Sequence, residues 1–391
     1  MKKRVHLLIL GSALLLAACS GASSSSSPAP SSEPSSSSAP AEIELTDNAG
    51  RKVKILPGSY KKVVCIGAGA LRLYSYVGDT SLLSGVEDID NSSLSERPKM
   101  FDNAARPYFM ANEEEFKKLP SCGVGGPNAQ AAEAEKILTC NPDIIISEYV
   151  DADKANALSE QIGVPVFTVN YGQGGVLNDT FYDALTNLGK IFATESRAQD
   201  LISFYKAENQ AIFDRTKDIA EAEQKSIYLC GLGNWGTTNH LMTAQNYLPL
   251  NNAHLKNVVT GLATNGIQAI DAEKFAQFTA EAEMMVFDAA AVKNIKGKEI
   301  DFSECAAFKT GEVYLQLPYN AYYINAETAL INNWFIAKSA YPRLFEDINI
   351  ENKANEITLK MNGVALYDKM KALPFSYGGY QKIANPTEFF K

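Results

Sequence analysis

The chain has 391 residues, of which 46% are hydrophobic and 21% charged, and its formal net charge is −9. This hydrophobic content is typical of a globular protein, and the acidic balance argues against nucleic-acid binding. A single hydrophobic core stops growing at roughly 250–300 residues, so the length predicts two lobes.

Residues 1–18 have the pattern of a secretory signal peptide. Three basic residues at positions 2–4 precede the apolar run 7–16, and the sequence LAAC follows at 16–19. The apolar run is too short to span a membrane, and small residues precede a cleavage point. The sequence at 16–19 resembles the bacterial lipobox, which implies cleavage before Cys19 and acylation of its thiol. The alternative is a plain signal peptide with an incidental cysteine.

A tether rich in serine and proline is predicted at residues 19–41. Residues 20–40 contain twelve Ser, four Pro and one charged side chain, Glu33. Such a segment buries too little apolar surface to offset the entropy lost on ordering. After removal of the basic signal, the mature protein carries a net charge near −12.

Short apolar runs alternate with helical patterns from about residue 42 onward. The runs are dense in β-branched residues and lie at 61–67, 141–147, 164–169, 226–231, 284–287 and 313–315. Continuous apolar strands of this kind predict parallel sheets that are covered on both faces. The fold class is therefore α/β, with two lobes.

The longest helical pattern, residues 194–223, contains no Gly or Pro and separates the two groups of strands. About thirty helical residues span roughly 45 Å, which is long enough to connect two lobes. We therefore predict a first lobe at 42–193, a connecting helix at 194–223 and a second lobe at 224–391. The alternative is an ordinary surface helix, with flexible crossover strands elsewhere.

The numbers of cysteine and histidine residues limit which metal ions the protein could hold directly. Apart from Cys19, five widely spaced cysteines form no C-x-x-C motif, so we expect a structural role for all five. The mature chain has only two histidines, His240 and His254. Naked zinc or manganese needs several converging imidazoles or carboxylates, so we predict no metal held directly by the protein. His240 follows a predicted cleft loop, whereas we expect a structural role for His254.

Several segments occur in the order of one known family. They are the lipobox, DNAGR at 47–51, KVVCI at 62–66, LLSGV at 82–86, the segment 135–146 with its Asn-Pro-Asp, IGVPV at 162–166, RPY at 106–108, LPYN at 317–320 and AYP at 340–342. The chain resembles substrate-binding lipoproteins of bacterial ABC importers for iron-siderophore complexes, haem and cobalamin, the periplasmic-binding family with a helical backbone. The resemblance covers nearly all of residues 42–391, with the binding domain at about 62–350. One departure is Ala282-Glu283, where the family usually has Pro-Asp.

The resemblance implies two Rossmann-like lobes with parallel sheets, joined by one long connecting helix, with a ligand cleft between the lobes. It implies a monomeric carrier, anchored by palmitate on the extracytoplasmic face of the cell membrane, that binds a ferric chelate such as a siderophore and no cofactor. Its partners are an ABC permease and its ATPase, and it binds no nucleic acid. Haem, cobalamin and molybdate or tungstate are alternative ligands.

A secreted, lipid-anchored enzyme is the alternative of a different class. No G-x-S-x-G, H-E-x-x-H or P-loop motif occurs, and no serine or cysteine lies in an evident nucleophile turn. Paired carboxylates are not excluded, but nothing in the sequence selects a pair. We therefore predict a protein that is not an enzyme.

Two glutamates are candidates for docking to the permease. Glu135 and Glu273 each open a Glu-Lys helix start that precedes a predicted strand, one in each lobe. The resemblance implies that these carboxylates meet arginines of the permease. The alternative is ordinary charge complementarity with the helix dipole.

Ligands of α/β lobes bind beyond the carboxyl ends of the strands. The sequence GAGALR at 67–72 has an arginine where a dinucleotide fingerprint requires its third glycine, so a nucleotide is disfavoured. Its amides, or those of GVGGPN at 123–128, are candidates to face an anionic ligand. The predicted ligand-binding residues are Arg72, Arg106, Tyr108, Tyr149, Tyr171, Trp235, His240, Tyr319, Tyr322 and Tyr323. Alternatively, Arg106 forms a structural ion pair and several tyrosines belong to the core.

Overall fold

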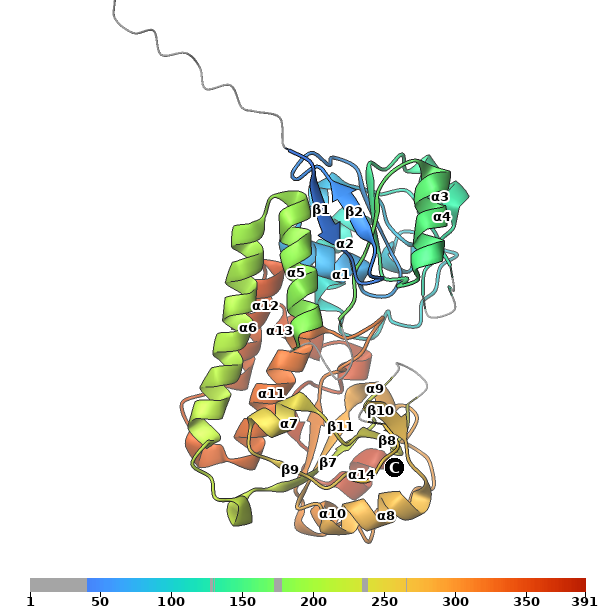
Figure 1. Ribbon diagram of the computed structural model, residues 1–391. Helices are drawn as coiled ribbons and strands as arrows, with labels where there is room; N and C mark the ends of the chain where they lie inside the picture. The colour runs from blue at the N-terminus through green and yellow to red at the C-terminus, as the bar shows by residue number, and fades with distance from the viewer. Residues whose placement is uncertain (1–40, 127–128, 130, 172–177, 234–237, 265) are drawn as a thin grey trace, which may run out of the picture. The chain divides into compact units, whose positions relative to one another are not determined.

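A four-stranded parallel sheet forms the centre of the first lobe (Figure 1). The computed structural model describes residues 41–391 except 127, 128, 130, 172–177, 234–237 and 265. In order of pairing, the strands are β4 (Leu83–Gly85), β3 (Val63–Ile66), β5 (Ile144–Ser147) and β6 (Val166–Thr168). β3, β5 and β6 are buried along their whole length, as their continuous apolar runs predict.

A five-stranded sheet forms the centre of the second lobe. Its order is β13 (Gln381–Lys382), β12 (Val313–Gln316), β11 (Met284–Asp288), β7 (Ser226–Cys230) and β9 (Lys256–Asn257). All neighbours are parallel except the pair β12–β13. The α/β fold class with two parallel-sheet lobes is therefore confirmed.

The two lobes anchor their central strands in the same way. The helices α3 (Ala134–Thr139) and α8 (Ala272–Glu281) lead into β5 and β11. Before β5, Asp143 accepts the amides of Lys61 and Lys62 at 2.6 and 3.0 Å. Before β11, Glu283 accepts the amide of Ser226 at 2.9 Å and Lys225 Nζ at 2.8 Å. The carboxylate of Glu283 thus accepts a backbone amide at the start of the neighbouring strand, as Asp143 does in the first lobe, although the Pro-Asp pattern is missing.

Two small antiparallel sheets were not predicted. They pair β1 (Ile43–Thr46) with β2 (Lys52–Ile55), and β8 (Met242–Ala244) with β10 (Ile267–Ala269). In the first hairpin, Asp47 accepts the amides of Ala49 and Arg51 and forms an ion pair with the Arg51 guanidinium at 2.6 Å. These strands mix polar and apolar residues over only three or four positions, so they lack the continuous apolar runs that mark the buried strands.

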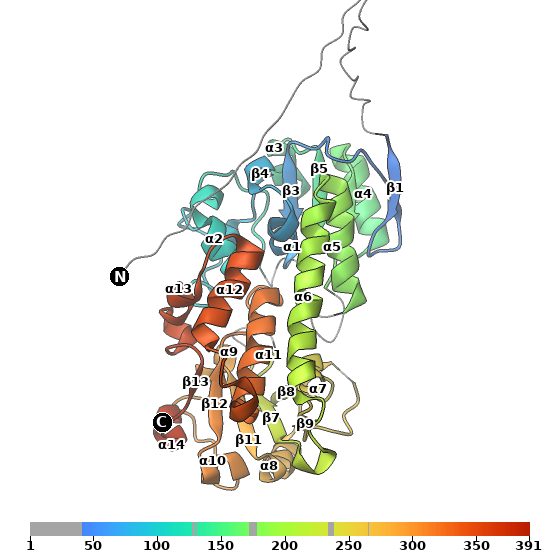
Figure 2. The same ribbon diagram turned by 90° about the vertical axis from the view of Figure 1, so that its left-hand side faces the viewer.

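The connecting helix α6 (Glu195–Thr216) starts one residue after the predicted boundary and ends seven residues before it; a short 3₁₀ turn, η3 (Glu221–Glu223), follows. Figures 1 and 2 show α6 running beside α5 (Asp179–Phe192) and α11 (Ala326–Ala340). α12 (Ile350–Asn362) packs on α11 and also contacts α1 (Ala70–Val77) and α2 (Pro107–Phe116) of the first lobe. Several helices therefore pack across the junction that α6 connects covalently.

One continuous hydrophobic core includes residues of both sheets and of the helices between them. Ile146 of β5 and Leu229 of β7 belong to it, together with Leu201 of α6 and Leu330 of α11. Separating the lobes would expose part of this core, at a cost of about 25 cal/mol for each Å² of apolar surface. The fold thus favours a nearly fixed spacing of the lobes.

The remaining elements cover the two sheets. The helices are α4 (Ala152–Ile162), α7 (Leu248–Asn252), α9 (Ala289–Val292), α10 (Ala306–Thr310), α13 (Tyr367–Lys371) and α14 (Pro386–Phe390), and the 3₁₀ turns are η1 (Thr80–Leu82), η2 (Asp88–Asp90), η4 (Pro342–Phe345) and η5 (Pro374–Ser376). Among the described residues, all five cysteines are buried and free. Within that part of the chain, no helix combines the length and the apolar character needed to cross a membrane.

Candidate ligand-binding site

The glycine turn after β3 is covered by a tyrosine. Gly67 and Gly69 have φ of 84° and 94°, which favours glycine at both positions. A Cβ atom at Gly69 would lie 2.7 Å from the ring of Tyr171, and the Tyr171 hydroxyl donates to the Gly69 carbonyl at 3.1 Å. The Gly67 amide donates to Oε1 of Glu87 at 3.0 Å. The amide of Gly67, which we predicted to face an anionic ligand, is therefore occupied by a carboxylate.

Arg72 of α1 is fully buried and reaches into the second lobe. Its Nη1 donates to the carbonyl oxygen of Ile324 at 2.8 Å. Its Nη2 donates to the carbonyl oxygen of Ala321 at 2.8 Å and to Oδ1 of Asn325 at 2.9 Å. The guanidinium also lies 4.6 Å from the ring centre of Tyr108. Arg72 thus connects the lobes in this structure, and its contact with a ligand stays a prediction.

Arg106 and Tyr108 share one buried carboxylate. Arg106 Nη1 and the Tyr108 hydroxyl both donate to Oδ1 of Asp90 at 2.7 Å, and Arg106 Nη2 donates to the carbonyl oxygen of Ile89 at 3.3 Å. Burial raises the pKa of Asp90, although the positive charge of Arg106 opposes that shift. This arrangement is the structural ion pair that the sequence left as an alternative for Arg106.

Tyr319 begins a loop, residues 319–325, and is anchored within its own lobe. Asp288, at the carboxyl end of β11, accepts the Tyr319 amide at 2.8 Å, Gln316 Nε2 at 3.1 Å and the Ala290 amide at 2.9 Å. Burial raises the pKa of Asp288 to about 7, although these three donors act in the opposite direction. The base of the loop is therefore fixed to the second lobe.

The other two predicted tyrosines of this loop contact the first lobe. The Tyr322 hydroxyl donates to Oε2 of Glu87 at 2.6 Å. The ring of Tyr323 lies 4.9 Å from the ring of Tyr171, and Tyr323 remains half-buried. Burial, together with the nearby charge of Glu148, raises the pKa of Tyr323 to about 12. The structure thus brings Tyr171, Tyr322 and Tyr323 together where the lobes meet.

Two carboxylates at this junction were missed by the sequence analysis. Burial raises the pKa of Glu87 to about 7, against the effect of its hydrogen bonds from Gly67 and Tyr322. Glu148 directly follows β5 and is half-buried; burial and then the charge of Glu87 raise its pKa to about 8. Glu148 follows the predicted strand at 141–147 and Glu87 follows the family segment at 82–86. These positions were the available signal, but the search concentrated on aromatic and cationic side chains.

His240 lies among aromatic rings of the second lobe. Its ring centre is 4.9 Å from that of Phe275 and 6.2 Å from that of Phe302, and burial lowers its pKa. Its Nδ1 is buried without a hydrogen-bond partner in the described part of the chain. Trp235 and Cys19 lie outside the described residues. Among the described residues, no three His, Cys, Asp or Glu side chains are grouped so as to hold a metal ion.

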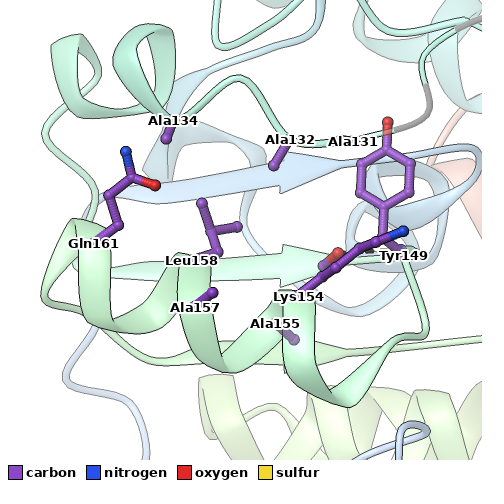
Figure 3. Close-up of a pocket in the computed structure, with 10 residues that line it drawn as sticks. Ala131, Ala132, Ala134, Tyr149, Lys154, Ala155, Ala157, Leu158 and Gln161 are labelled. Atoms are coloured by element: carbon purple, nitrogen blue, oxygen red, sulfur yellow. Dashed lines mark hydrogen bonds between the residues drawn. The ribbon is translucent and has the colours of Figure 1, made fainter.

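Tyr149 lines a separate hollow of about 190 Å³ between α3 and α4 (Figure 3). Tyr149 and Lys154 lie at one end of it and Gln161 at the other. Lys154 forms an ion pair with Asp151 at 3.6 Å. The rest of the wall is largely apolar and is built from Ala131, Ala132, Ala134, Ala155, Ala157 and Leu158. Tyr149 is thus half-buried beside small side chains.

The two predicted docking glutamates occupy equivalent exposed positions. Glu135 lies in the first turn of α3 and Glu273 in the first turn of α8, and each helix leads into a central strand. Neither carboxylate forms an ion pair within the described ranges. Both are therefore accessible to a partner.

A comparison of the sequence with known protein families finds a match to one family. The family described as periplasmic binding protein matches residues 102–314, which is more than half of the chain. The chain belongs to the periplasmic binding protein family. Membership makes it an extracytoplasmic binding protein.

Similar proteins have the same two-lobed fold. Molybdate-binding protein MolA of Haemophilus influenzae is 21% identical over 338 residues, covering 80% of this chain and 88% of MolA. The molybdate-bound structure of MolA has a TM-score of 0.63 at 17% identity and covers 83% of this chain and 98% of that one. A periplasmic solute binding protein of Veillonella parvula has a TM-score of 0.65 at 16% identity, with 90% and 100% covered. The TroA-like FepB of the same organism has a TM-score of 0.58 at 19% identity, with 83% and 97% covered. These are binding proteins and none is named as an enzyme.

Proposed function

We propose that this periplasmic binding protein is the lipid-anchored, substrate-binding component of an ABC importer. It captures a chelated iron compound, such as a ferric siderophore, and delivers it to a permease without chemical change. Cys19 carries the lipid, and residues 20–40 let the binding domain search the membrane surface near the permease. Tethering raises the effective concentration at the permease, so a weak docking contact is sufficient.

The observation that carries the proposal is the aromatic junction of the two lobes. Tyr171, Tyr322 and Tyr323 meet between the carboxyl ends of two parallel sheets, and binding proteins of this architecture take ligands at such edges. Tyr323 is half-buried and offers part of its phenol ring at this junction, which suits a bulky chelate more than a small ion, whereas Tyr171 and Tyr322 are buried and support it. Haem and cobalamin share these properties and remain alternative ligands.

Molybdate is a second candidate because MolA shares this fold and binds molybdate. A bare oxyanion needs free hydrogen-bond donors, preferably cationic ones. Both Nη nitrogens of Arg72 donate to protein oxygens, and Arg106 is paired with Asp90. The Nε groups of both arginines have no partner among the described residues, but both side chains are fully buried. The internal segments outside the described residues contain no Lys, Arg or His. These features favour a chelate over molybdate.

Intrinsic fluorescence tests the ligand class. The chain has two tryptophans, Trp235 in a predicted cleft loop and Trp334 in α11, whose ring packs at 5.9 Å from Phe345. We expect a ferric hydroxamate or catecholate chelate to quench the wild type and Trp334→Phe, but to quench Trp235→Phe much less. Molybdate is expected to leave all three signals unchanged. Quenching by molybdate alone would overturn the iron proposal and leave the carrier role in place.

A further inference from the structure

Loop 319–325 contains two consecutive tyrosines with left-handed backbone. The φ angle is 54° at Tyr322 and 72° at Tyr323. Such a conformation is strained at a non-glycine residue and persists only where the surroundings fix it. Within the loop, the Ala321 amide donates to the Tyr323 carbonyl at 3.0 Å, and Asn320 pairs with Ile324 as an isolated bridge. These short-range bonds close the turn, but they leave its tip to be held from outside.

The first lobe holds the tip through a buried hydroxyl. Tyr322 is 3% exposed, and its hydroxyl donates to Oε2 of Glu87 at 2.6 Å and accepts the Gly126 amide at 3.0 Å. The other Glu87 oxygen accepts the Gly67 amide. The Tyr322 ring lies 5.8 Å from that of Phe101, in an apolar cluster shared by the two lobes. The tip is therefore held by three separate segments of the first lobe, which contain Glu87, Gly126 and Phe101.

The first lobe also holds the base of the loop. Arg72 donates to the carbonyl oxygens of Ala321 and Ile324 and to Oδ1 of Asn325. Nδ2 of Asn325 in turn donates to the carbonyl oxygen of Ala105 in the first lobe at 3.0 Å. All of these groups are buried, so no water competes for the bonds at their present spacing.

We infer that Tyr322 is a positioning residue that latches loop 319–325 across the two lobes and thereby holds Tyr323 against Tyr171 at the ligand face. We call Arg72, Glu87, Tyr322 and Asn325 the cross-lobe latch. Its role in ligand binding rests on the proposed function, whereas the latch itself is a property of the protein without ligand. With the latch closed, the ligand meets a face that is already formed, and little energy is lost in ordering it.

The hydroxyl of Tyr322, and not only its ring, carries this role. A phenylalanine at position 322 fills the same space but leaves Glu87 Oε2 and the Gly126 amide buried without their present partner. Each buried group that loses its partner destabilises the closed arrangement. Glutamine at position 87 is milder. Its carbonyl accepts the Gly67 amide and its amide donates to the Tyr322 oxygen, so that only the Tyr322 proton is left without its acceptor.

Hydrogen–deuterium exchange of the protein without ligand tests the latch. In Tyr322→Phe, we expect peptides covering the loop and peptides covering Gly126 to exchange at least about tenfold faster, the effect of losing one buried hydrogen bond. Glu87→Gln, which leaves one buried group without a partner in place of two, is expected to accelerate the same peptides less than Tyr322→Phe does. The matched control is Tyr247→Phe, which removes a buried tyrosine hydroxyl of the second lobe that has no partner in the described residues. Tyr247→Phe should leave both groups of peptides unchanged.

A binding measurement separates the latch from the proposed function. We expect the Kd of a ferric hydroxamate chelate to rise about tenfold in Tyr322→Phe, to rise less in Glu87→Gln, and to stay unchanged in the control Tyr247→Phe. Unchanged exchange in Tyr322→Phe, or equal acceleration in Tyr247→Phe, would overturn the latch. If exchange responds as expected but the wild type binds no ferric chelate, haem or cobalamin, the latch stands and the iron proposal fails. If exchange responds and the Kd of Tyr322→Phe does not, Tyr322 has no positioning role.

Discussion

Two buried carboxylates of similar chemistry do different work in the two lobes. Asp288 is the last residue of β11 and accepts three donors, all from the second lobe. Glu87 follows β4 and accepts one donor from its own lobe, Gly67, and one from the other lobe, Tyr322. Burial raises the pKa of both groups to about 7. A buried carboxylate that accepts several hydrogen bonds therefore fixes the loop within the second lobe in one case and joins the loop to the first lobe in the other.

This difference shows how one loop can belong to both lobes. Asp288 fixes the start of loop 319–325 to the second lobe, and Glu87 holds its tip in the first. A loop with only the first contact would move with the second lobe. With both contacts, the loop resists changes in the spacing of the lobes, as does the continuous core beneath it.

Removing the hydrogen bonds that Arg72 donates to the base of the loop should have the largest effect on the free energy of unfolding. Arg72→Met keeps the length and apolar stem of the side chain, but leaves two buried carbonyl groups and Asn325 Oδ1 without their donors. We expect a loss of about 3–5 kcal/mol in the free energy of unfolding, measured by urea denaturation. Arg343→Met, at an exposed arginine of η4, is the matched control and should leave the midpoint unchanged. A stable Arg72→Met variant would show that the loop base needs no hold from the first lobe.

Isosteric amide substitutions should separate the anchor from the latch. In Asp288→Asn, the new amide group faces only donors, so at least one bond is replaced by repulsion; we expect a loss of roughly 1–3 kcal/mol in unfolding free energy. In Glu87→Gln, the Tyr322 hydroxyl can turn and accept the new amide in addition to the Gly126 amide, and only its own proton loses an acceptor, so the expected loss is smaller, about 1 kcal/mol. Equal losses, or the reverse order, in parallel urea titrations would contradict the assigned hydrogen-bond roles.

The pH dependence of stability should come from both carboxylates. Their pKa values in the folded protein lie above the ordinary values of roughly 4, so the folded state binds more protons between pH 4 and 7. Their stabilising contribution is complete below about pH 4, falls as the pH rises to about 7, and is constant above it. The difference in unfolding free energy between wild type and Glu87→Gln/Asp288→Asn should follow this course. A difference that does not change with pH would mean that both groups ionise in the folded protein without penalty, and one that rises with pH would mean that their pKa values are lowered.

The sequence predicted the repeating framework of the lobes better than their junction. The central strands β3, β5, β7, β11 and β12 stood out because continuous apolar runs mark strands buried on both faces. The Glu-Lys helix starts before β5 and β11 also appeared as expected.

The side-chain contacts between the lobes could not be predicted from local sequence patterns. Arg72 and Tyr322 were singled out as ligand contacts because arginine and tyrosine at strand ends suit ligands. Their partners are some 250 residues away in the chain for Arg72 and 235 for Tyr322. Pairing over such distances depends on tertiary packing, which leaves no periodic signal in one sequence. The left-handed backbone of two consecutive tyrosines is likewise imposed by those distant contacts.

The smallest effect on stability is expected at the exposed glutamates, one in each lobe. Glu135→Gln and Glu273→Gln should leave the unfolding midpoint unchanged, because neither carboxylate has an ion-pair partner among the described residues. If both dock to the permease, each substitution should lower uptake of a ferric chelate by the native host. Glu160→Gln, at an exposed position of α4, is the control. Normal uptake with both substitutions combined would remove the docking role.

A double-mutant cycle at Glu87 and Tyr322 tests the cross-lobe latch most directly. The free energy of unfolding is measured by urea denaturation, without ligand, for the wild type, Glu87→Ala, Tyr322→Phe and the double variant. A latch formed by these two side chains predicts a coupling energy of about 1–2 kcal/mol, so that the double variant loses less than the sum of the single losses. Additivity within about 0.5 kcal/mol would contradict the latch and leave the lobes joined by the helices and the core alone.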